Sequence, residues 1–346
     1  MAKGFHFFSV PVRPVLRNFF LASILLACLL GSIFKAEARE VTPFNNGWEF
    51  KKGPFPTDAM QTAARWNADW EQVNVPHTWN ADDMQKKTNS FYAGVAYYRK
   101  HYVFPESLEG KRLFLRFEGV GACAEVYVNG YLVGTHKGAY SAFVCEIGSQ
   151  VRLGEENEIV VKSDNVARPD VIPVNHALFG VYGGIYRPVW LIVTEPCNIV
   201  VNDCASPGVY ITQKNVSKQS ADVSVRVKLD NATLAPAALE LENAIYTREG
   251  KLVKVHRQSF ELTPQGVQNY VSDFKISHPH LWQGREDPYL YKVVSRLKQD
   301  GQVIDEVIQP LGLRKYEAVA GKGFFLNGKK YPMYGVTRHQ DWWGMG

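Results

Sequence analysis

The stretch KRLFLRFEGVGACAEVYVNGYLVGTHKGAYSAFVCEI, residues 111–147, decides the fold class. In it Leu113, Leu115 and Phe117 alternate with residues of mixed polarity, which is the period-two pattern of a strand with one buried face. The dipeptide Asn129-Gly130 separates two further strand-like runs. Both of its residues tolerate the positive φ of a two-residue turn, so the stretch predicts antiparallel strands that include a hairpin.

The surrounding sequence continues this pattern of short strands separated by turn residues. Further strands are expected at Tyr97–Phe104, Ser141–Glu146, Asn157–Lys162 and Ile185–Val193. Their regular spacing favours a β-sandwich closed by long connections, the jelly-roll arrangement. The composition, with 46% hydrophobic, 13% aromatic and 21% charged residues, is that of a folded, β-rich chain.

A chain of 346 residues exceeds what one hydrophobic core usually organises, so at least two domains are expected. Pro, Asn and Asp residues interrupt the apolar pattern between 194 and 207, where we place a boundary. Beyond it, about seven strand-like segments in about 110 residues fit an immunoglobulin-like sandwich, although the Cys, Trp and Cys framework of that fold is absent. The predicted domains after the amino-terminal segment are residues 39–196, 197–314 and 315–346.

The final piece, GFFLNGKKYPMYGVTRHQDWWGMG, differs from both sandwiches. It begins with a second hairpin signal at Asn327-Gly328 and continues through the apolar residues 331–336 into a polar and aromatic loop. An apolar strand followed by such a loop is typical of the opening strand of a (β/α)₈ (TIM) barrel. The whole chain is therefore expected to be mainly β, with a jelly roll, an immunoglobulin-like sandwich and the first strand of a truncated barrel.

The first 38 residues have the pattern of a secretory signal peptide. Basic residues Arg13 and Arg17 precede the apolar stretch 19–34, and Ala36-Glu37-Ala38 offers small residues at a cleavage site. An exported protein, periplasmic or extracellular, is expected. Two alternatives stay open: a membrane anchor, although the apolar stretch is short for a span, and a lipoprotein modified at Cys28.

The net charge and the cysteines give little information about partners or disulfides. The net charge of +5 arises mostly in the amino-terminal segment, and no long basic run suggests a nucleic-acid partner. Beyond that segment lie Cys123, Cys145, Cys197 and Cys204, which allow three disulfide connectivities, with Cys197 and Cys204 the closest pair. Buried free thiols are an equally open interpretation.

Seven motifs occur in an order that resembles glycoside hydrolase family 2 of the β-galactosidase and β-glucuronidase type. They are VPHTWNADD (75–83), YYRK (97–100), RLFLRFEGV with AEVYVNG (112–130), YGGIYRPVWL (182–191), LWQGREDPYLY (281–291), GLR (312–314) and FFLNGKKYPMYGVTRHQD (324–341). The resemblance implies a sugar-binding jelly roll, an immunoglobulin-like domain and a catalytic barrel. It covers nearly everything after the signal.

Retaining glycosidases use two carboxyl groups, a general acid/base and a nucleophile. The resemblance places both on glutamates of later barrel strands, which this sequence lacks, so we nominate no catalytic residue and expect the isolated chain to be inactive. The resemblance makes Arg338 and His339 substrate-binding residues, with His339 contacting sugar hydroxyls and Arg338 bracing the site. Thr337 stands where the family pattern has Asn, which leaves the local geometry of that pocket open.

The jelly roll of some family members lends an acidic loop to the active site. The equivalent stretch here is 175–180, where Leu178 stands in place of the usual Asp. No metal site and no cofactor are therefore expected, while Asn175 and His176 are either hydrogen-bonding substitutes or ordinary loop residues. For a second cluster, His77, Trp79, Asp82 and Asp83, we expect a structural role, with Trp79 in the core and the aspartates at a turn.

The expected function is that of the amino-terminal part of an exported, β-galactosidase-like glycoside hydrolase acting on O-glycosidic bonds. Its partner would be a β-linked oligosaccharide or glycoside, and a homo-oligomer is possible by resemblance. The alternative is a non-catalytic carbohydrate-binding or docking protein. The sugar and its linkage depend on barrel loops and do not follow from these residues.

Overall fold

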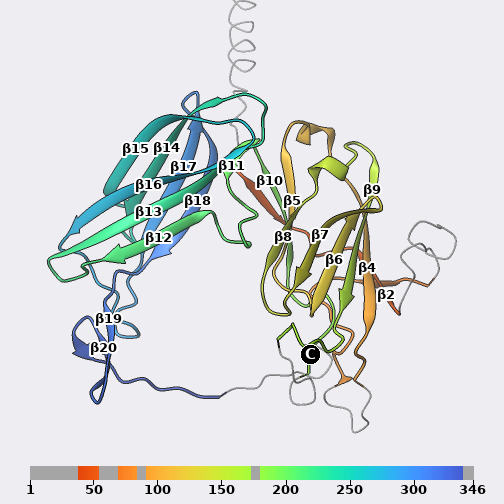
Figure 1. The fold of residues 1–346 in the computed structure, drawn as a ribbon, viewed down its shortest axis with the longest axis horizontal. Coiled ribbons are helices and arrows are strands. Elements are labelled where there is room, and N and C mark those ends of the chain that lie inside the picture. Colours follow the sequence, from red (N-terminus) through yellow and green to blue (C-terminus); the bar gives the residue numbers. More distant parts are fainter. Residues whose placement is uncertain (1–37, 54–68, 84–90, 173–179, 338–346) are drawn as a thin grey trace, which may run out of the picture. The chain divides into compact units, whose positions relative to one another are not determined.

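The computed structural model describes residues 38–53, 69–83, 91–172 and 180–337, and in these ranges the regular secondary structure is β-strand apart from two short 3₁₀ turns (Figure 1). Two β-sandwiches follow each other along the chain, and a small three-stranded sheet comes after the second. The predicted fold class, a mainly β chain with two successive sandwiches, is confirmed.

The first sandwich is made of two antiparallel sheets. One has the strand order β1-β10-β5-β8 and the other the order β3-β2-β4-β9-β6-β7. The strands are β1 (Glu40–Pro43), β2 (Trp48–Lys52), β3 (Glu71–Val73), β4 (Val95–Val103), β5 (Arg112–Phe117), β6 (Cys123–Val128), β7 (Tyr131–Lys137), β8 (Phe143–Glu146), β9 (Glu156–Asp164) and β10 (Val189–Thr194). Two 3₁₀ turns, η3 (Glu106–Leu108) and η4 (Gly148–Gln150), lie between strands.

The hairpin predicted at Asn129-Gly130 is present between β6 and β7. Asn129 and Gly130 have φ values of 51° and 83°, and Val128 pairs with Tyr131 across the turn. The strand expected from Ile185 begins instead at Val189, because Pro188 has no amide hydrogen to donate to a neighbouring strand.

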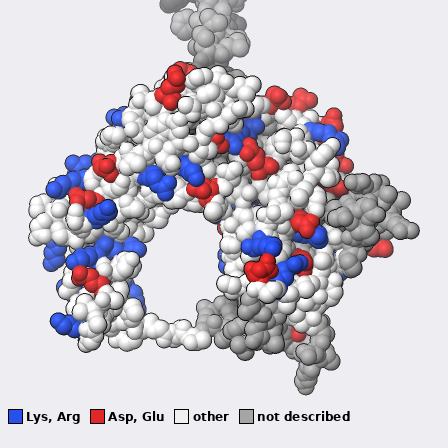
Figure 2. Space-filling view, viewed as in Figure 1, with Lys and Arg blue, Asp and Glu red and all other residues white. Residues whose placement is uncertain are grey.

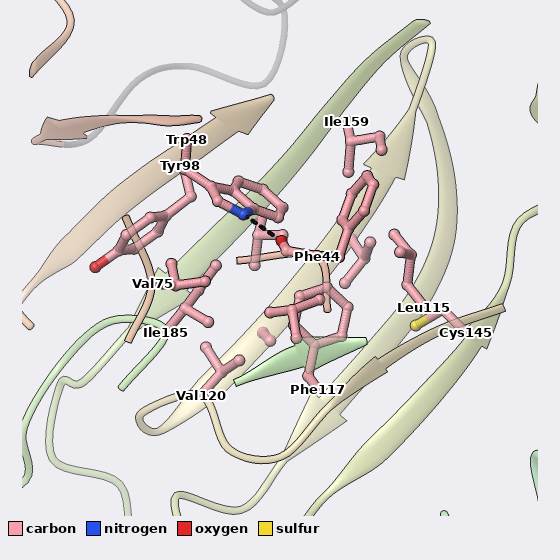
Figure 3. Close-up of a cluster of buried hydrophobic side chains, with 14 of the residues drawn as sticks. Phe44, Trp48, Val75, Tyr98, Leu115, Phe117, Val120, Cys145, Ile159 and Ile185 are labelled. Atoms are coloured by element: carbon pink, nitrogen blue, oxygen red, sulfur yellow. Dashed lines mark hydrogen bonds between the residues drawn. The ribbon is translucent and has the colours of Figure 1, made fainter. Parts of the chain in front are cut away.

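The core of the first sandwich is rich in aromatic side chains (Figure 3). Trp48 is fully buried, and its indole Nε1 donates a hydrogen bond of 2.9 Å to the carbonyl oxygen of Phe44. Phe117 of β5 and Tyr98 of β4 lie in the same cluster. The inward positions of both sheets therefore carry the large apolar residues that the alternating pattern predicts.

The second sandwich also has two sheets. Strands β11 (Cys197–Ile199), β12 (Val209–Lys214), β13 (Ser220–Asn231) and β16 (Gly266–Ser277) form one, with β13 at its centre. Strands β14 (Ala237–Tyr246), β15 (Leu252–Leu262), β17 (Tyr291–Gln299) and β18 (Gln302–Leu311) form the other, in the order β15-β14-β17-β18. Strand β11 lies inside the stretch that the sequence marked as a break, so only Glu195 and Pro196 separate β10 from β11.

Three arginines of the first sandwich bind acceptors of the second. Arg39 forms two hydrogen bonds, of 2.8 and 2.7 Å, with the fully buried carboxylate of Asp305. Arg112 donates to Asp230 at 2.7 Å, and Arg116 donates to the carbonyl oxygen of Ala205. These bonds connect residues far apart in the sequence, which no local pattern could have indicated.

The four cysteines within the described residues are free thiols. Cys145 and Cys197 are buried, Cys123 is partly buried and Cys204 is exposed. Burial raises the pKa of Cys145 to about 12, so this thiol is protonated at neutral pH. Of the two interpretations left open by the sequence, the structure shows free thiols.

Ion pairs cover one face of the second sandwich around Glu242. Its nearly buried carboxylate accepts hydrogen bonds from Arg257 at 2.6 Å, Arg296 at 3.1 Å and Lys298 at 2.9 Å. Burial would raise the pKa of Glu242, but the bonds from Lys298, Arg257 and Arg296 outweigh it and lower the pKa to about 2. Figure 2 shows acidic and basic side chains intermixed over the face that it displays.

This shift predicts a defined acid response. The ordinary pKa of Glu242 is 4.5, so the stability that its ion pairs contribute is fully present above pH 4.5 and is lost as the pH falls from there towards about 2. Glu242→Gln should lower the urea midpoint at pH 7 and flatten its decline between pH 4.5 and 2. Glu261→Gln, an exposed carboxylate without an ion pair in the described structure, is the control. Equal acid sensitivity of the two variants would contradict the assignment.

Candidate functional site

The two residues nominated from the sequence as substrate-binding, Arg338 and His339, lie outside the described residues, as do 173–179 and Trp342 and Trp343. The structure does describe the chain that leads to Arg338. There a small sheet consists of β19 (Tyr316–Val319), β20 (Gly323–Leu326) and β21 (Lys329–Lys330). The hairpin predicted at Asn327-Gly328 joins β20 to β21, with φ values of 49° and 81° at its two turn residues.

This hairpin is fastened to a loop of the second sandwich. The side-chain amide of Asn327 donates to the carbonyl oxygen of Trp282 at 2.9 Å and to Oε1 of Gln283 at 3.0 Å. Four residues further on, the Tyr331 hydroxyl accepts a bond of 3.3 Å from the amide of Arg285. The motif LWQGREDPYLY thus holds the start of the segment that runs towards Arg338 and His339.

Residues 331–337 are not paired as a strand in this structure, although a first barrel strand was expected at 331–336. Three of their apolar side chains are strongly exposed: Met333 by 73%, Tyr334 by 88% and Val336 by 93%. The amide of Tyr331 donates to the carbonyl oxygen of Phe324 at 2.9 Å, but within the described residues no strand lies beside 332–337 to satisfy their backbone groups. The barrel strand therefore stays a prediction.

Two of the motifs, far apart in the sequence, meet at one end of the first sandwich. The amide of His77 donates to the carbonyl oxygen of Ile185 at 2.8 Å, and the amide of Gly183 donates to Oδ1 of Asn80 at 2.8 Å. The indole of Trp79 lies directly against Gly183, where a Cβ atom would approach Cζ2 to 1.8 Å. The glycine is required because the ring occupies the space of any side chain.

Buried amide side chains hold this junction together. Asn80 and Asn165 are fully buried, and Nδ2 of Asn165 donates to Oδ1 of Asn80 at 3.1 Å and to the carbonyl oxygen of Val181 at 2.8 Å. Oδ1 of Asn165 accepts the amide of Gly94 at 2.8 Å. Nδ2 of Asn80 donates to Asp83 at 2.7 Å. The network joins the turn that contains Asn80 and Asp83 to the backbone of Gly94 and Val181.

His77, Trp79 and Asp83 have the structural roles that the sequence suggested. Trp79 is 7% exposed and belongs to the core, and Asp83 accepts one hydrogen bond within its turn, from Asn80, and one from the amide of Tyr92. Nδ1 of His77 lies 2.8 Å from the Tyr98 hydroxyl. Burial lowers the pKa of His77 and raises that of Tyr98, so both are neutral at pH 7.

A hollow of about 510 Å³ lies beside this cluster. Its lining combines the rings of Phe50, His77 and Trp79 with two lysines and two carboxylates, which are Lys51, Lys52, Asp69 and Glu71. Charged groups of both signs beside several rings are a lining that can bind a polar ligand. Sequence reasoning missed Asn80, Asn165 and Tyr331, and it named Asn327 only as a turn residue. Asn80, Tyr331 and Asn327 lie within quoted motifs, whereas no pattern in the sequence marked Asn165.

Within the described ranges, no helix is long and apolar enough to cross a membrane. No group of three or more His, Cys, Asp or Glu side chains in those ranges could hold a metal ion.

Comparison with known proteins identifies the family. Residues 42–196 match the sugar binding domain of the glycosyl hydrolases family 2, and residues 207–314 match a second domain described as glycosyl hydrolases family 2. With both domains matched in the family's order, the chain belongs to glycoside hydrolase family 2.

Individual relatives carry two different activity names. A β-glucuronidase of Bacteroides fragilis is 39% identical over 320 residues, which is 92% of this chain and 44% of that protein. The crystal structure of a candidate β-galactosidase from Bacteroides fragilis is 72% identical, with a TM-score of 0.86 over 90% of this chain and 46% of its own. A β-glucuronidase of Bacteroides uniformis is 31% identical, with a TM-score of 0.83 over 89% of this chain and 36% of its own. This chain spans less than half the length of each.

Proposed function

We propose that this chain provides the two leading sandwiches of an enzyme that hydrolyses β-linked glycosides, with β-galactosides as its substrates. The observation that carries the proposal is the 72% identity with the candidate β-galactosidase over 90% of this chain. At that level of identity the two sandwiches support the same kind of catalytic domain. A second candidate substrate, a β-glucuronide, is favoured by the 39% identical β-glucuronidase.

In this proposal the sandwiches act by positioning. Asn327 and Tyr331 attach the carboxyl-terminal hairpin to the second sandwich, and the exposed residues Met333, Tyr334 and Val336 continue into a barrel strand that pairs with later strands. Arg338 and His339 then stand at the carboxyl end of that strand, where barrel enzymes carry their substrate-binding groups. The two catalytic carboxylates would come from the barrel, so the 346-residue chain alone is inactive.

The test is hydrolysis by a longer protein that contains this sequence. With p-nitrophenyl β-galactoside and β-glucuronide as substrates, we expect kcat/KM to be higher for the galactoside, and the 346-residue chain to turn over neither. His339→Ala should lower kcat/KM by about 10- to 100-fold, because one hydrogen bond to the sugar is lost. His278→Asn, on an exposed turn of the second sandwich, should leave it unchanged.

The outcomes separate the candidates. If the longer protein prefers the glucuronide, the proposed substrate becomes a β-glucuronide and the proposed reaction, hydrolysis of a β-linked glycoside, is unchanged. A longer protein that binds both glycosides without hydrolysing either would instead indicate a carbohydrate-binding protein. Full activity of His339→Ala would contradict the positioning role of the hairpin.

We further propose that the protein is exported and that its signal is cleaved after Ala38. Small residues at 36 and 38 fit the specificity of the cleaving enzyme. The mature chain would then begin at Arg39, the residue whose side chain binds Asp305. Amino-terminal sequencing of the exported protein should read Arg-Glu-Val-Thr. A lipid-modified chain that begins at Cys28 would show lipoprotein processing instead, and an intact amino terminus would show an anchor.

A further inference from the structure

Lys100 occupies an unusual place in the first sandwich. In β4 the alternate residues Ala96 and Tyr98 face the core and are fully buried, and Tyr102 packs against the same core. Lys100 shares their parity and is only 8% exposed. A lysine thus stands at an inward position of a strand, where its ammonium group has lost most of its contact with water.

The ammonium group is compensated by ring contacts and one hydrogen bond, but not by an opposite charge. Its Nζ lies 4.7 Å from the ring centroid of Phe44 and 5.8 Å from those of Trp48 and Tyr102, and it donates one hydrogen bond, to the carbonyl oxygen of Asn46. Figure 3 shows Phe44 and Trp48 joined by their own hydrogen bond. No carboxylate in the described part of the chain forms an ion pair with Lys100. A buried charge is normally paired, so the remaining donors of Nζ are available to an anion.

These donors line a hollow of about 320 Å³. Thr42, Asn45 and Asn46 line it too, and the half-buried ring of Tyr102 forms part of its wall. Asn45 Oδ1 accepts the amide of Val189 at 2.8 Å, while its Nδ2 has no partner among the described residues. The volume lies at the lower end of the roughly 300 to 1,000 Å³ typical of small-molecule sites, which suits a single sugar ring.

The structure assigns to this hollow a binding subsite for one hexose unit that carries an anionic group, either a carboxylate or a sulfate. The anionic group accepts hydrogen bonds from Lys100. The side-chain amides of Asn45 and Asn46 and the hydroxyl of Thr42 bind sugar hydroxyls, and the ring of Tyr102 contacts the C–H face of the sugar. Glu40, at the exposed rim, can accept a hydrogen bond from a sugar hydroxyl. Its carboxylate repels a ligand that is bound with its anionic group towards the rim. The choice of a sugar rests on the proposed function, whereas the requirement for an anion rests on Lys100 itself.

Among the described residues, Lys100 is the one buried lysine. Lys137, for example, is exposed and already paired with Asp170 at 2.7 Å. Lys100 also has a pKa lowered by burial, so a bound anion, which favours the charged ammonium, should raise that pKa again. The subsite thus predicts both a ligand preference and a proton uptake when binding is measured near the pKa of Lys100.

The test is calorimetric titration of the full 346-residue chain with four ligands: methyl β-D-glucuronide, galactose 6-sulfate, methyl β-D-galactoside and sodium sulfate. We expect both charged sugars to bind at least about tenfold more tightly than the neutral one, since a charge-assisted hydrogen bond is gained. Sulfate alone should bind more weakly than galactose 6-sulfate. The difference between the two charged sugars identifies which anionic group the subsite takes.

Variants locate the subsite. Lys100→Met keeps the apolar stem and should abolish the preference for charged sugars, while Lys254→Met, an exposed and unpaired lysine of β15, should retain it. Tyr102→Leu should weaken the binding of charged and neutral sugars alike. This variant tests the location of the subsite if thermal unfolding shows that Lys100→Met does not fold. Equal binding of charged and neutral sugars by the wild-type chain, or binding of sulfate as tight as that of galactose 6-sulfate, overturns the proposal.

The result is independent of the hydrolysis assay. A longer protein that hydrolyses β-galactosides, together with a chain that ignores anionic sugars, would leave the proposed function intact and remove only the subsite. If the chain binds charged sugars and the longer protein has no glycosidase activity, the subsite is supported and the proposed function is contradicted.

Discussion

Asp305→Ala is expected to lower the free energy of unfolding of the second sandwich by about 3 to 5 kcal/mol, the range observed when one partner of a buried ion pair is removed. The Asp305 carboxylate is fully buried and accepts three hydrogen bonds, two from Arg39 and one of 2.7 Å from the amide of Ile199. Without it, the guanidinium group and the amide lose their acceptor. Urea unfolding followed by tryptophan fluorescence, to which Trp282 is the only contributor between residues 197 and 337, measures the change.

A double variant separates the ion pair from the rest of the site. Arg39→Met combined with Asp305→Val removes both charges, so it should cost less than Asp305→Ala alone. The unpaired amide of Ile199 should still leave a loss of about 1 to 3 kcal/mol. Asp300→Asn, on an exposed turn where asparagine tolerates the φ of 51°, is the control. A loss below about 1 kcal/mol for Asp305→Ala would show that the pair contributes little.

Gly183→Ala is expected to destabilise the first sandwich by about 3 kcal/mol, at the upper end of the usual cost of overpacking. The new methyl group would lie 1.8 Å from Cζ2 of Trp79, so the indole must leave a place in which its Nε1 donates 3.2 Å to the carbonyl oxygen of Tyr92. The movement would also disturb the bond from Gly183 to Asn80. The shift in the urea midpoint of the first sandwich gives the magnitude.

The rescue experiment for this variant is specific. In a Trp79→Leu background the space beside Gly183 is larger, so Gly183→Ala should cost much less than in the wild-type chain. Gly148→Ala is the matched control, because a Cβ atom there meets its nearest neighbour, the amide nitrogen of Leu113, at an ordinary 3.6 Å. Equal costs in the two backgrounds would mean that the clash with Trp79 is not the cause.

Much of the fold follows from local sequence. Alternation in residues 111–147 predicted the strands of the first sandwich, and the Asn-Gly pairs at 129 and 327 predicted two hairpins that the structure contains. These features depend on neighbouring residues only: a pleated strand requires alternation, and a two-residue turn requires positive φ. Pro188 shows the limit, since one missing amide hydrogen moved the start of β10 to Val189.

Contacts between distant residues could not be predicted. Arg39 and Asp305 are separated by 266 positions, and Asn80 and Asn165 by 85, so only the folded chain brings each pair together. Lys100 was quoted as part of the YYRK motif. The motif does not reveal that the ammonium group of Lys100 lies against aromatic rings and not in solvent. The nominated residues Arg338 and His339 lie beyond the described chain, so their role stays a prediction.

The short connection between β10 and β11 also bears on how enzymes of this kind could be recombined. Thr194 ends one sandwich and Cys197 begins the next, and Lys111 forms an ion pair with Glu195 between them. A chimaera that joins the first sandwich of one relative to the second of another would have to match this pair, the Arg112 to Asp230 bond and the Arg39 to Asp305 bond at once. The two sandwiches should therefore be inherited and exchanged as one unit, and viable crossover points are better sought after Leu313 than between the sandwiches.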